Sequence, residues 1–262
     1  MGIIGRPGKP RPSETIPVTV PGNLIPMPGE TKRELAVIIP AKNEAGRIGR
    51  VIKAVLEAKL PTEVIVVSDG STDGTGDVAR TFPGVKVIEL AVNQGKASAM
   101  NAGVKSTPAR LVLFIDADLD GLRGTHLDQI ALPLLTGECE MSVGIFRGGG
   151  KWSDAAMQVS PALSGQRAMR RELFEAVPNI EQLGMGIEVA LNQTAKRRRA
   201  RVVRVILRGV SNAHKEKKLG WMKGVAARTK MFVEITEAMV TNGQRRNPRD
   251  RKRKHGQWRG KR

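Results

Sequence analysis

Two carboxylates with one residue between them, Asp116 and Asp118, follow a run of five apolar residues at 111–115. A short run of this kind, rich in β-branched and aromatic residues, indicates a strand buried on both faces of a mostly parallel sheet. Side chains at i and i+2 of an extended segment point the same way, so the two carboxylates can converge beyond the strand. They repel each other unless a cation lies between them, and a hard divalent ion fits best. A plain acidic turn is the alternative, because Asp favours turns.

The same order of apolar run, polar loop and helix appears twice upstream. Residues 35–44 pass from an apolar stretch into a polar loop, and apolar residues at helical spacing follow over 48–56. Residues 64–75 repeat this order and open another helix. Alternating strands and helices with short loops predict a parallel, doubly wound α/β sheet, which binds ligands beyond the carboxyl ends of its strands. Three polar clusters at one rim favour a ligand site over three unrelated turns.

Four motifs in this half resemble, in order and spacing, those of the GT-A glycosyltransferases of family 2. They are Ile39-Pro40-Ala41-Lys42-Asn43-Glu44, Val67-Ser68-Asp69-Gly70-Ser71-Thr72-Asp73-Gly74-Thr75, Asn93-Gln94-Gly95-Lys96 through Asn101-Ala102-Gly103, and Asp116-Ala117-Asp118. The resemblance covers roughly residues 35–120 and implies a GT-A, Rossmann-like fold. It also implies a metal-dependent hexosyltransferase that uses Mg²⁺ or Mn²⁺ and a nucleotide-diphosphate sugar, with UDP favoured. Residues 164–168 and 184–188 resemble acceptor-side segments of glucosyl-3-phosphoglycerate synthases and similar enzymes.

On the donor side, the resemblance implies residues that bind the nucleotide. Asp69 lies where family members accept the imide proton of uracil, and Ser68 replaces the first Asp of a pair that many members carry. The residues expected to hold the uridine are Pro40, Ala41 and Glu44.

The implied chemistry requires a diphosphate to leave as an oxocarbenium-like centre develops. A metal ion held by Asp118, with Asp116 reaching the ribose or the ion, would neutralise the charge on the leaving oxygen. Lys96 would add a positive charge at the phosphates or hydrogen-bond the base, and a plain surface lysine is the alternative. In related enzymes a histidine after the late strand completes the metal shell. His214 occupies that place, and an exposed loop histidine is the alternative.

On the acceptor side, Gly165, Gln166 and Arg167 are expected to cradle a phosphate or carboxylate. Glu188 is the carboxylate best placed to contact the sugar or to act as a base, so it is predicted to be catalytic together with Asp118. The glycine-rich residues 148–152 would close over the donor. The sequence leaves open whether the reaction inverts or retains the anomeric configuration.

The 262 residues are long enough for one large domain. We predict a Pro/Gly-rich extended arm over 1–34, a glycosyltransferase domain over 35–240, and a basic disordered tail over 241–262. The domain divides into a nucleotide-sugar half, 35–120, and an acceptor half, 121–240. One cysteine excludes a disulfide framework, and the chain has neither an apolar run of membrane-spanning length nor an apolar signal core. These features predict a cytoplasmic protein.

The chain is strongly basic, with 44 Lys and Arg against 25 Asp and Glu, a formal net charge of +19. Ten of the basic residues lie in 245–262, which predicts a solvated tail and a peripheral contact with an anionic membrane. Nucleic-acid binding is the distant alternative, disfavoured because aromatics make up 3% and Tyr is absent. The favoured acceptor is a small phosphorylated or carboxylated molecule, with a polyprenyl phosphate or other membrane lipid as the alternative. Whether the chain forms a homodimer stays open.

Further elements are expected from periodicity and capping. We predict helices over 97–105, 125–135, 167–177 and 187–198, strands over 141–146 and 202–207, and an amphipathic helix within 219–240. Thr125 is expected to cap its helix and Asp73 to cap the helix that follows it. The residues expected to be structural or solvent-exposed are Cys139, His126 and His255.

Overall fold

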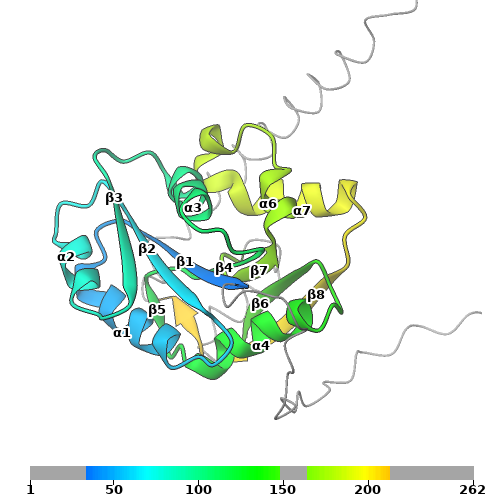
Figure 1. Ribbon diagram of the computed structural model, residues 1–262, viewed down its shortest axis with the longest axis horizontal. Helices are drawn as coiled ribbons and strands as arrows, with labels where there is room; N and C mark the ends of the chain where they lie inside the picture. The colour runs from blue at the N-terminus through cyan, green and yellow to red at the C-terminus, as the bar shows by residue number, and fades with distance from the viewer. Residues whose placement is uncertain (1–33, 148–163, 213–262) are drawn as a thin grey trace, which may run out of the picture. The chain divides into compact units, whose positions relative to one another are not determined.

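In the computed structural model, residues 34–147 and 164–212 are described, and they form a central sheet with helices on both faces (Figure 1). The strands are β1 (Leu35–Ala41), β2 (Glu63–Asp69), β3 (Val85–Leu90), β4 (Leu111–Phe114), β5 (Leu119–Asp120), β6 (Met141–Arg147), β7 (Arg167–Arg170), β8 (Val202–Arg208) and β9 (Ser211–Asn212). The α-helices are α1 (Ala45–Leu56), α2 (Thr75–Arg80), α3 (Lys96–Lys105), α4 (Gly124–Leu135), α6 (Arg171–Glu175) and α7 (Ile187–Arg197). Two short 3₁₀ turns, Ile180–Gln182 and Gly184–Gly186, precede α7.

The main sheet has seven strands in the order β3-β2-β1-β4-β7-β6-β8. β1 pairs in parallel with β2 and β4, β2 with β3, and β6 with β8, whereas β7 is antiparallel to both of its neighbours. The other six strands therefore run in one direction, and their carboxyl ends form one rim. The predicted mostly parallel α/β sheet is confirmed. A separate two-stranded sheet pairs β5 with β9.

Each face of the sheet carries its own apolar layer. On one face Ile39, Val66 and Leu113 belong to a buried cluster that includes residues of α1, α2 and α4. On the other face the cluster includes residues of α3, α6 and α7. All four residues of β4 are buried, as expected for a strand covered on both sides. β4 thus ends at Phe114 in the middle of the sheet, so the polar residues that follow it emerge at the centre of the rim.

Most predicted elements lie where expected, and two predictions are wrong. The predicted helix over 167–177 is strand β7 followed by the short helix α6, because residues 167–170 pair with β4 and β6. Thr125 does not cap α4, whose N-cap residue is Arg123, with the Arg123 N–H donating to His126 Nδ1 at 3.2 Å. Strand β3 had not been predicted.

The predictions of a structural role for Cys139 and His126 agree with their burial. Cys139 lies just before β6 with 1% of its surface exposed, and burial raises the pKa of its thiol to about 11, which removes it as a nucleophile. His126 is also buried, and burial together with Arg123 lowers its pKa. Among the described residues, no helix combines the length and the apolar character needed to cross a membrane. The predictions for residues 1–33, 148–152, His214, 219–240, 241–262 and His255 lie outside the described residues.

Candidate functional site

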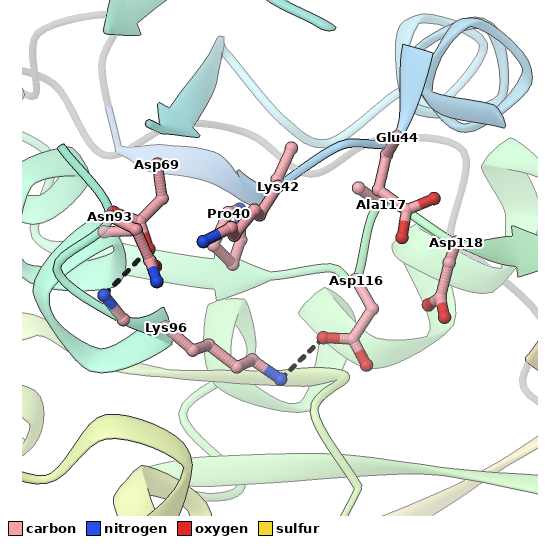
Figure 2. Close-up of a pocket in the computed structure, with 12 residues that line it drawn as sticks. Pro40, Lys42, Glu44, Asp69, Asn93, Lys96, Asp116, Ala117 and Asp118 are labelled. Atoms are coloured by element: carbon pink, nitrogen blue, oxygen red, sulfur yellow. Dashed lines mark hydrogen bonds and ion pairs between the residues drawn. The ribbon is translucent and has the colours of Figure 1, made fainter. Parts of the chain in front are cut away.

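A cleft of about 380 Å³ opens at the centre of the rim (Figure 2). The carboxyl ends of β1 and β2, the segment after β4 and the start of α3 contribute its walls. Its lining residues are Pro40, Ala41, Lys42, Glu44, Asp69, Asn93, Gly95, Lys96, Ala99, Asp116, Ala117 and Asp118. Every residue predicted on the donor side therefore lies in one cleft, together with the predicted metal ligand Asp118.

Lys96 is the centre of the polar network in this cleft. Its Nζ donates to Asp116 Oδ1 at 2.6 Å (Figure 2). It also donates to Glu188 Oε1 at 2.7 Å, so Lys96 joins the predicted donor half to the predicted acceptor half. Burial alone would lower the pKa of Lys96, but Asp116 and Glu188 raise it above its usual value overall. The alternative of a plain surface lysine is excluded, because only 15% of its side chain is exposed.

The Asp116 carboxylate is fixed on its other side by the start of β7. Gln166 is buried, and its Nε2 donates to Asp116 Oδ2 at 2.8 Å. Gly165 packs so closely that a Cβ there would lie 2.6 Å from Asp116 Oδ2 and 2.7 Å from Lys96 Nζ. Two of the three predicted acceptor residues therefore touch the Asp116 carboxylate.

Arg167 does not lie where an acceptor can reach it. It is fully buried, and its guanidinium donates to the Ser164 carbonyl at 2.5 Å and to the Glu188 carbonyl and Asn192 Oδ1, both at 3.3 Å. Burial lowers its pKa, Glu188 and Asp116 oppose that shift, and an arginine stays protonated regardless. The predicted cradle at Arg167 is therefore replaced by a structural role: it ties the start of β7 to the start of α7, which carries Glu188.

Asp69 shapes the loop that delivers Lys96. Its Oδ1 accepts from the Gln94 N–H at 2.6 Å and its Oδ2 from the Gly95 N–H at 2.8 Å. Gly95 has φ +91°, a conformation that favours glycine, and it is the N-cap residue of α3. Each carboxylate oxygen keeps a second lone pair, so Asp69 can also accept from a bound base. The sequence did not reveal this loop-shaping role, because its partners are backbone amides.

A second network joins the loops after β1 and β2. Asp73 Oδ1 accepts from the Thr75 N–H at 3.1 Å, and Asp73 Oδ2 accepts from the Ala45 N–H at 3.0 Å. Although burial raises the pKa of Asp73, these hydrogen bonds lower it overall. Asp73 thus accepts from the first helical amide of both α2 and α1, but it lies one residue before Gly74, the N-cap residue of α2, and Glu44 is the N-cap residue of α1. Glu44, in the loop after β1, donates its N–H to Thr75 Oγ1 at 2.8 Å.

Negative charge dominates the cleft. The lining carries four carboxylates against two ammonium groups, a formal charge of −2. No three His, Cys, Asp or Glu side chains gather as a metal site within 34–147 and 164–212. Asp118 is 5% exposed and lies just before β5, whose Leu119 is the register partner of Asn212 in β9. Asn212 Oδ1 is buried and has no hydrogen-bond partner among the described residues. This oxygen-rich donor set suits a hard divalent cation, which takes one or two carboxylates and completes its shell with water and substrate phosphates.

A seven-stranded, mostly parallel sheet with a cleft at the rim beyond β1, β2 and β4 is typical of the GT-A, Rossmann-like class of α/β proteins. The sequence profile described as "Glycosyl transferase family 2" matches residues 36–178, more than half of the chain. The protein belongs to this family.

Curated relatives and solved structures agree with this assignment. The chain is 38% identical over 96 residues to 4,4'-diaponeurosporenoate glycosyltransferase of Staphylococcus aureus, a match that covers 35% of this chain. The chain spans about a quarter of the length of the curated relatives it matches. Among solved structures, glucosyl-3-phosphoglycerate synthase from Mycobacterium tuberculosis with Mn²⁺, UDP-glucose and phosphoglyceric acid is 26% identical, with a TM-score of 0.61. That similarity covers 78% of this chain and 82% of the synthase.

Two further structures give the same result. The same synthase in complex with Mg²⁺ and UDP is 26% identical, with a TM-score of 0.59, and the similarity covers 73% of this chain and 79% of that one. A mycobacterial protein of unstated activity is 25% identical, with a TM-score of 0.62, over 72% of this chain and 70% of its own. These coverages exceed the donor half, residues 35–120, so the similarity extends into the acceptor half.

Proposed function

We propose that this protein transfers a sugar from a UDP-sugar to a small phosphorylated or carboxylated acceptor, with the help of a divalent metal ion. One observation carries the proposal: Asp116 and Asp118 emerge together from the central strand into a cleft that also holds Asp69, Glu44 and Lys96. The similarity to a synthase solved with UDP-glucose and a divalent ion supports this choice of donor and cofactor.

The charge of the cleft explains why a cation is needed. A diphosphate brought into a lining of formal charge −2 would be repelled. Asp118, with Asp116 and the side-chain oxygen Oδ1 of Asn212 as further candidates, would hold Mg²⁺ or Mn²⁺. When bound, this ion supplies the Lewis acid that stabilises negative charge on the leaving diphosphate. His214, predicted as a further ligand, stays a prediction.

The chain's own residues position the reactants. Asp69 and the loop it holds would receive the base, with the walls formed by Pro40, Ala41 and Glu44 enclosing the uridine. Lys96 presents a fixed positive charge between Asp116 and Glu188, where an entering phosphate can share it. Glu188 Oε1 is held by Lys96. Its carboxylate is thereby fixed where it can contact the transferred sugar or take a proton from the acceptor hydroxyl.

Donor-side turnover tests the proposal most directly. The full-length protein is incubated with UDP-glucose, UDP-galactose and GDP-mannose, with and without Mn²⁺, and nucleotide release is measured with 3-phosphoglycerate as acceptor. We expect UDP release that requires the metal and stops with EDTA. Metal-independent release, or no binding of UDP by calorimetry in Mn²⁺, would overturn the proposal.

A membrane-lipid acceptor is the second candidate, favoured by the carotenoid-acid acceptor in the name of the Staphylococcus aureus relative. The basic residues 245–262 would then bind an anionic bilayer. Deletion of 245–262 separates the two acceptor classes. With a soluble acceptor, the truncated protein keeps its turnover. With a lipid acceptor, it loses both liposome binding and activity on membrane-presented substrate, and the loss resembles that caused by high salt. We favour the soluble acceptor, a cytoplasmic location and no role in binding nucleic acid.

A further inference from the structure

The carboxyl ends of β6 and β8 bring two arginines side by side. Arg147 and Arg208 are register partners in this parallel pair, and both are exposed. Among the strand pairs of the described residues, this is the one position where both partners are charged. Like charges on adjacent strands repel each other. An anion bound between the two guanidinium groups would relieve this repulsion.

The described part of the chain does not supply that counter-charge. Neither Arg147 nor Arg208 has an ion pair or a side-chain hydrogen bond there. Several other exposed arginines do have an acidic partner: Arg50 with Asp120, Arg80 with Asp77 and Glu89, Arg110 with Glu34, and Arg201 with Glu140. The stretch from 189 to 212 contains seven basic residues and no acidic residue. Two adjacent guanidinium forks without an acidic neighbour are suited to a bidentate anion such as a phosphate.

The position of the pair relates it to the cleft. β6 and β8 run in the same direction as β4, so both arginines lie at the rim that carries Asp116. Residues alternate between the faces of a strand, so Met141 and Val143, six and four residues before Arg147, lie on the same face as Arg147. Both pack in the cluster beneath α6 and α7. Both arginines therefore share the sheet face of α7, the helix that carries Glu188.

The strand register also gives a distance. Phe114 and Val143 are both partners of Arg167, and two strand spacings separate β4 from β6. Asp116 lies two residues beyond Phe114, and Arg147 lies four residues beyond Val143. Arg147 is therefore two residues further along the strand direction than Asp116 is. With strands about 4.8 Å apart and a rise of about 3.3 Å per residue, the two Cα atoms are separated by about 12 Å. A small acceptor with its hydroxyl at the cleft and its anionic group at the arginines fits this span.

We propose that Arg147 and Arg208 form an anion clamp that binds the phosphate of the acceptor. This inference rests on the proposed function and names the residues that select the acceptor. The buried Arg167 cannot do so, because all of its described partners are internal to the protein. The recognised group is a phosphate, whether it belongs to a soluble metabolite or to a lipid headgroup.

Arg204 provides a matched control. It lies on the same strand and the same face as Arg208, it is also exposed, and its partner across the pair is Val143. Basic side chains on an edge strand can simply prevent edge-to-edge pairing of sheets. A role of that kind would involve Arg204 and Arg208 equally. Phosphate binding by the clamp requires Arg147 and Arg208 and does not require Arg204.

The test measures binding directly, without turnover. Full-length wild type, R147Q, R208Q, R147Q/R208Q and R204Q are titrated by calorimetry, at one ionic strength, with 3-phosphoglycerate, inorganic phosphate and undecaprenyl phosphate in detergent micelles. UDP with Mn²⁺ is titrated in parallel as a measure of the donor site. We expect a Kd for phosphate ligands raised about tenfold in each single variant and about a hundredfold in the double variant. R204Q should stay within about twofold of wild type, and UDP binding should be unchanged throughout.

The outcomes separate the clamp from the function on which it rests. A double variant that binds phosphate ligands as wild type does, an equal loss in R204Q, or a wild type that binds none of the three ligands overturns the clamp. Failure of UDP binding and sugar transfer, with the phosphate result intact, overturns the proposed function and leaves the clamp standing. A loss confined to 3-phosphoglycerate assigns the clamp to a soluble acceptor, and a loss confined to the micelles assigns it to a lipid phosphate.

Discussion

The donor half and the acceptor half of the rim hold their charged groups in opposite ways. In the donor half, both oxygens of Asp69 accept hydrogen bonds from a neighbouring loop, and both oxygens of Asp116 are bonded to side chains. In the acceptor half, Arg147 and Arg208 stand side by side, and no acidic group of the described residues lies against them. The proposed donor pocket is thus already held in place by internal hydrogen bonds. The acceptor region instead carries charge that a ligand would neutralise.

If the donor half is preassembled for a metal, Asp118 should be the most sensitive residue. We expect Asp118→Asn to lower turnover about a thousandfold, roughly 4 kcal/mol of lost stabilisation of the leaving group. The fold should survive, because the amide has nearly the same shape. Metal-dependent UDP release and circular dichroism check this. Asp120→Asn is the control, since Asp120 lies two residues further and forms a partly exposed ion pair with Arg50. Equal turnover in the two variants would contradict the special role of Asp118.

Substitution of Arg167 tests whether its buried hydrogen bonds support the acceptor half of the site. Arg167→Met should leave the carbonyls of Ser164 and Glu188 and the Oδ1 of Asn192 without this donor, at about 3 kcal/mol of unfolding free energy. Urea unfolding measures the loss. Arg170→Met, three residues further in the same strand and exposed, should change stability by less than about 0.5 kcal/mol. If both variants are equally stable, Arg167 does not support the site.

Substitution of Asp69 tests whether nucleotide binding depends on the loop that carries Gln94 and Gly95. Asp69→Ala removes the acceptor for the Gln94 and Gly95 amides, so Lys96 should lose its fixed position. We expect UDP affinity to fall by about 1.5–3 kcal/mol, the value of a hydrogen bond to a charged group. Calorimetry with UDP and Mn²⁺ measures the change, and Asp77→Ala serves as an exposed control. An unchanged affinity would show that neither the loop nor base recognition depends on Asp69.

The smallest effect concerns pH and a residue outside both halves of the site. Burial and Arg123 lower the pKa of His126, so the unfolded chain binds its proton more readily than the folded protein does. Stability from neutral His126 is present above about pH 6.5 and is lost as pH falls through the lowered value. The melting temperature of wild type should therefore drop about 1–2 °C more than that of His126→Gln between pH 7.5 and pH 5.5. Parallel melting curves at all pH values would contradict this.

The sequence predicted what depends on local pattern. The apolar run before Asp116 defined a buried strand, and the alternation of strands and helices defined the sheet and the rim. Residues 167–177 were predicted as helix, and Arg, Ala, Met, Glu and Leu in this stretch are strong helix formers. Pairing with β4 and β6 overrode that preference at residues 167–170. The pairing with β4 joins residues more than fifty positions apart, the pairing with β6 joins residues 24 to 28 positions apart, and single-sequence periodicity carries no information on either.

The site shows the same limit. Motif spacing predicted that Asp69, Lys96 and Asp116 lie at one rim. It could not show that Lys96 bridges Asp116 to Glu188, because Glu188 lies 92 residues after Lys96 in the sequence. The burial of Arg167 could not be predicted either, because it depends on which face of β7 the helix α7 covers. The Arg147–Arg208 pair follows from the register of β6 with β8, which only the assembled sheet defines.

The hydrogen bonds that Asp73 accepts from two helices have a mechanical consequence. One carboxylate holds the first turn of α1 through Ala45 and the first turn of α2 through Thr75. We therefore expect that a nucleotide which moves one of the two loops also moves the other loop and the first turns of both helices. Hydrogen exchange should report this as a single event, with the Ala45 and Thr75 amides slowing together by a similar factor when UDP binds.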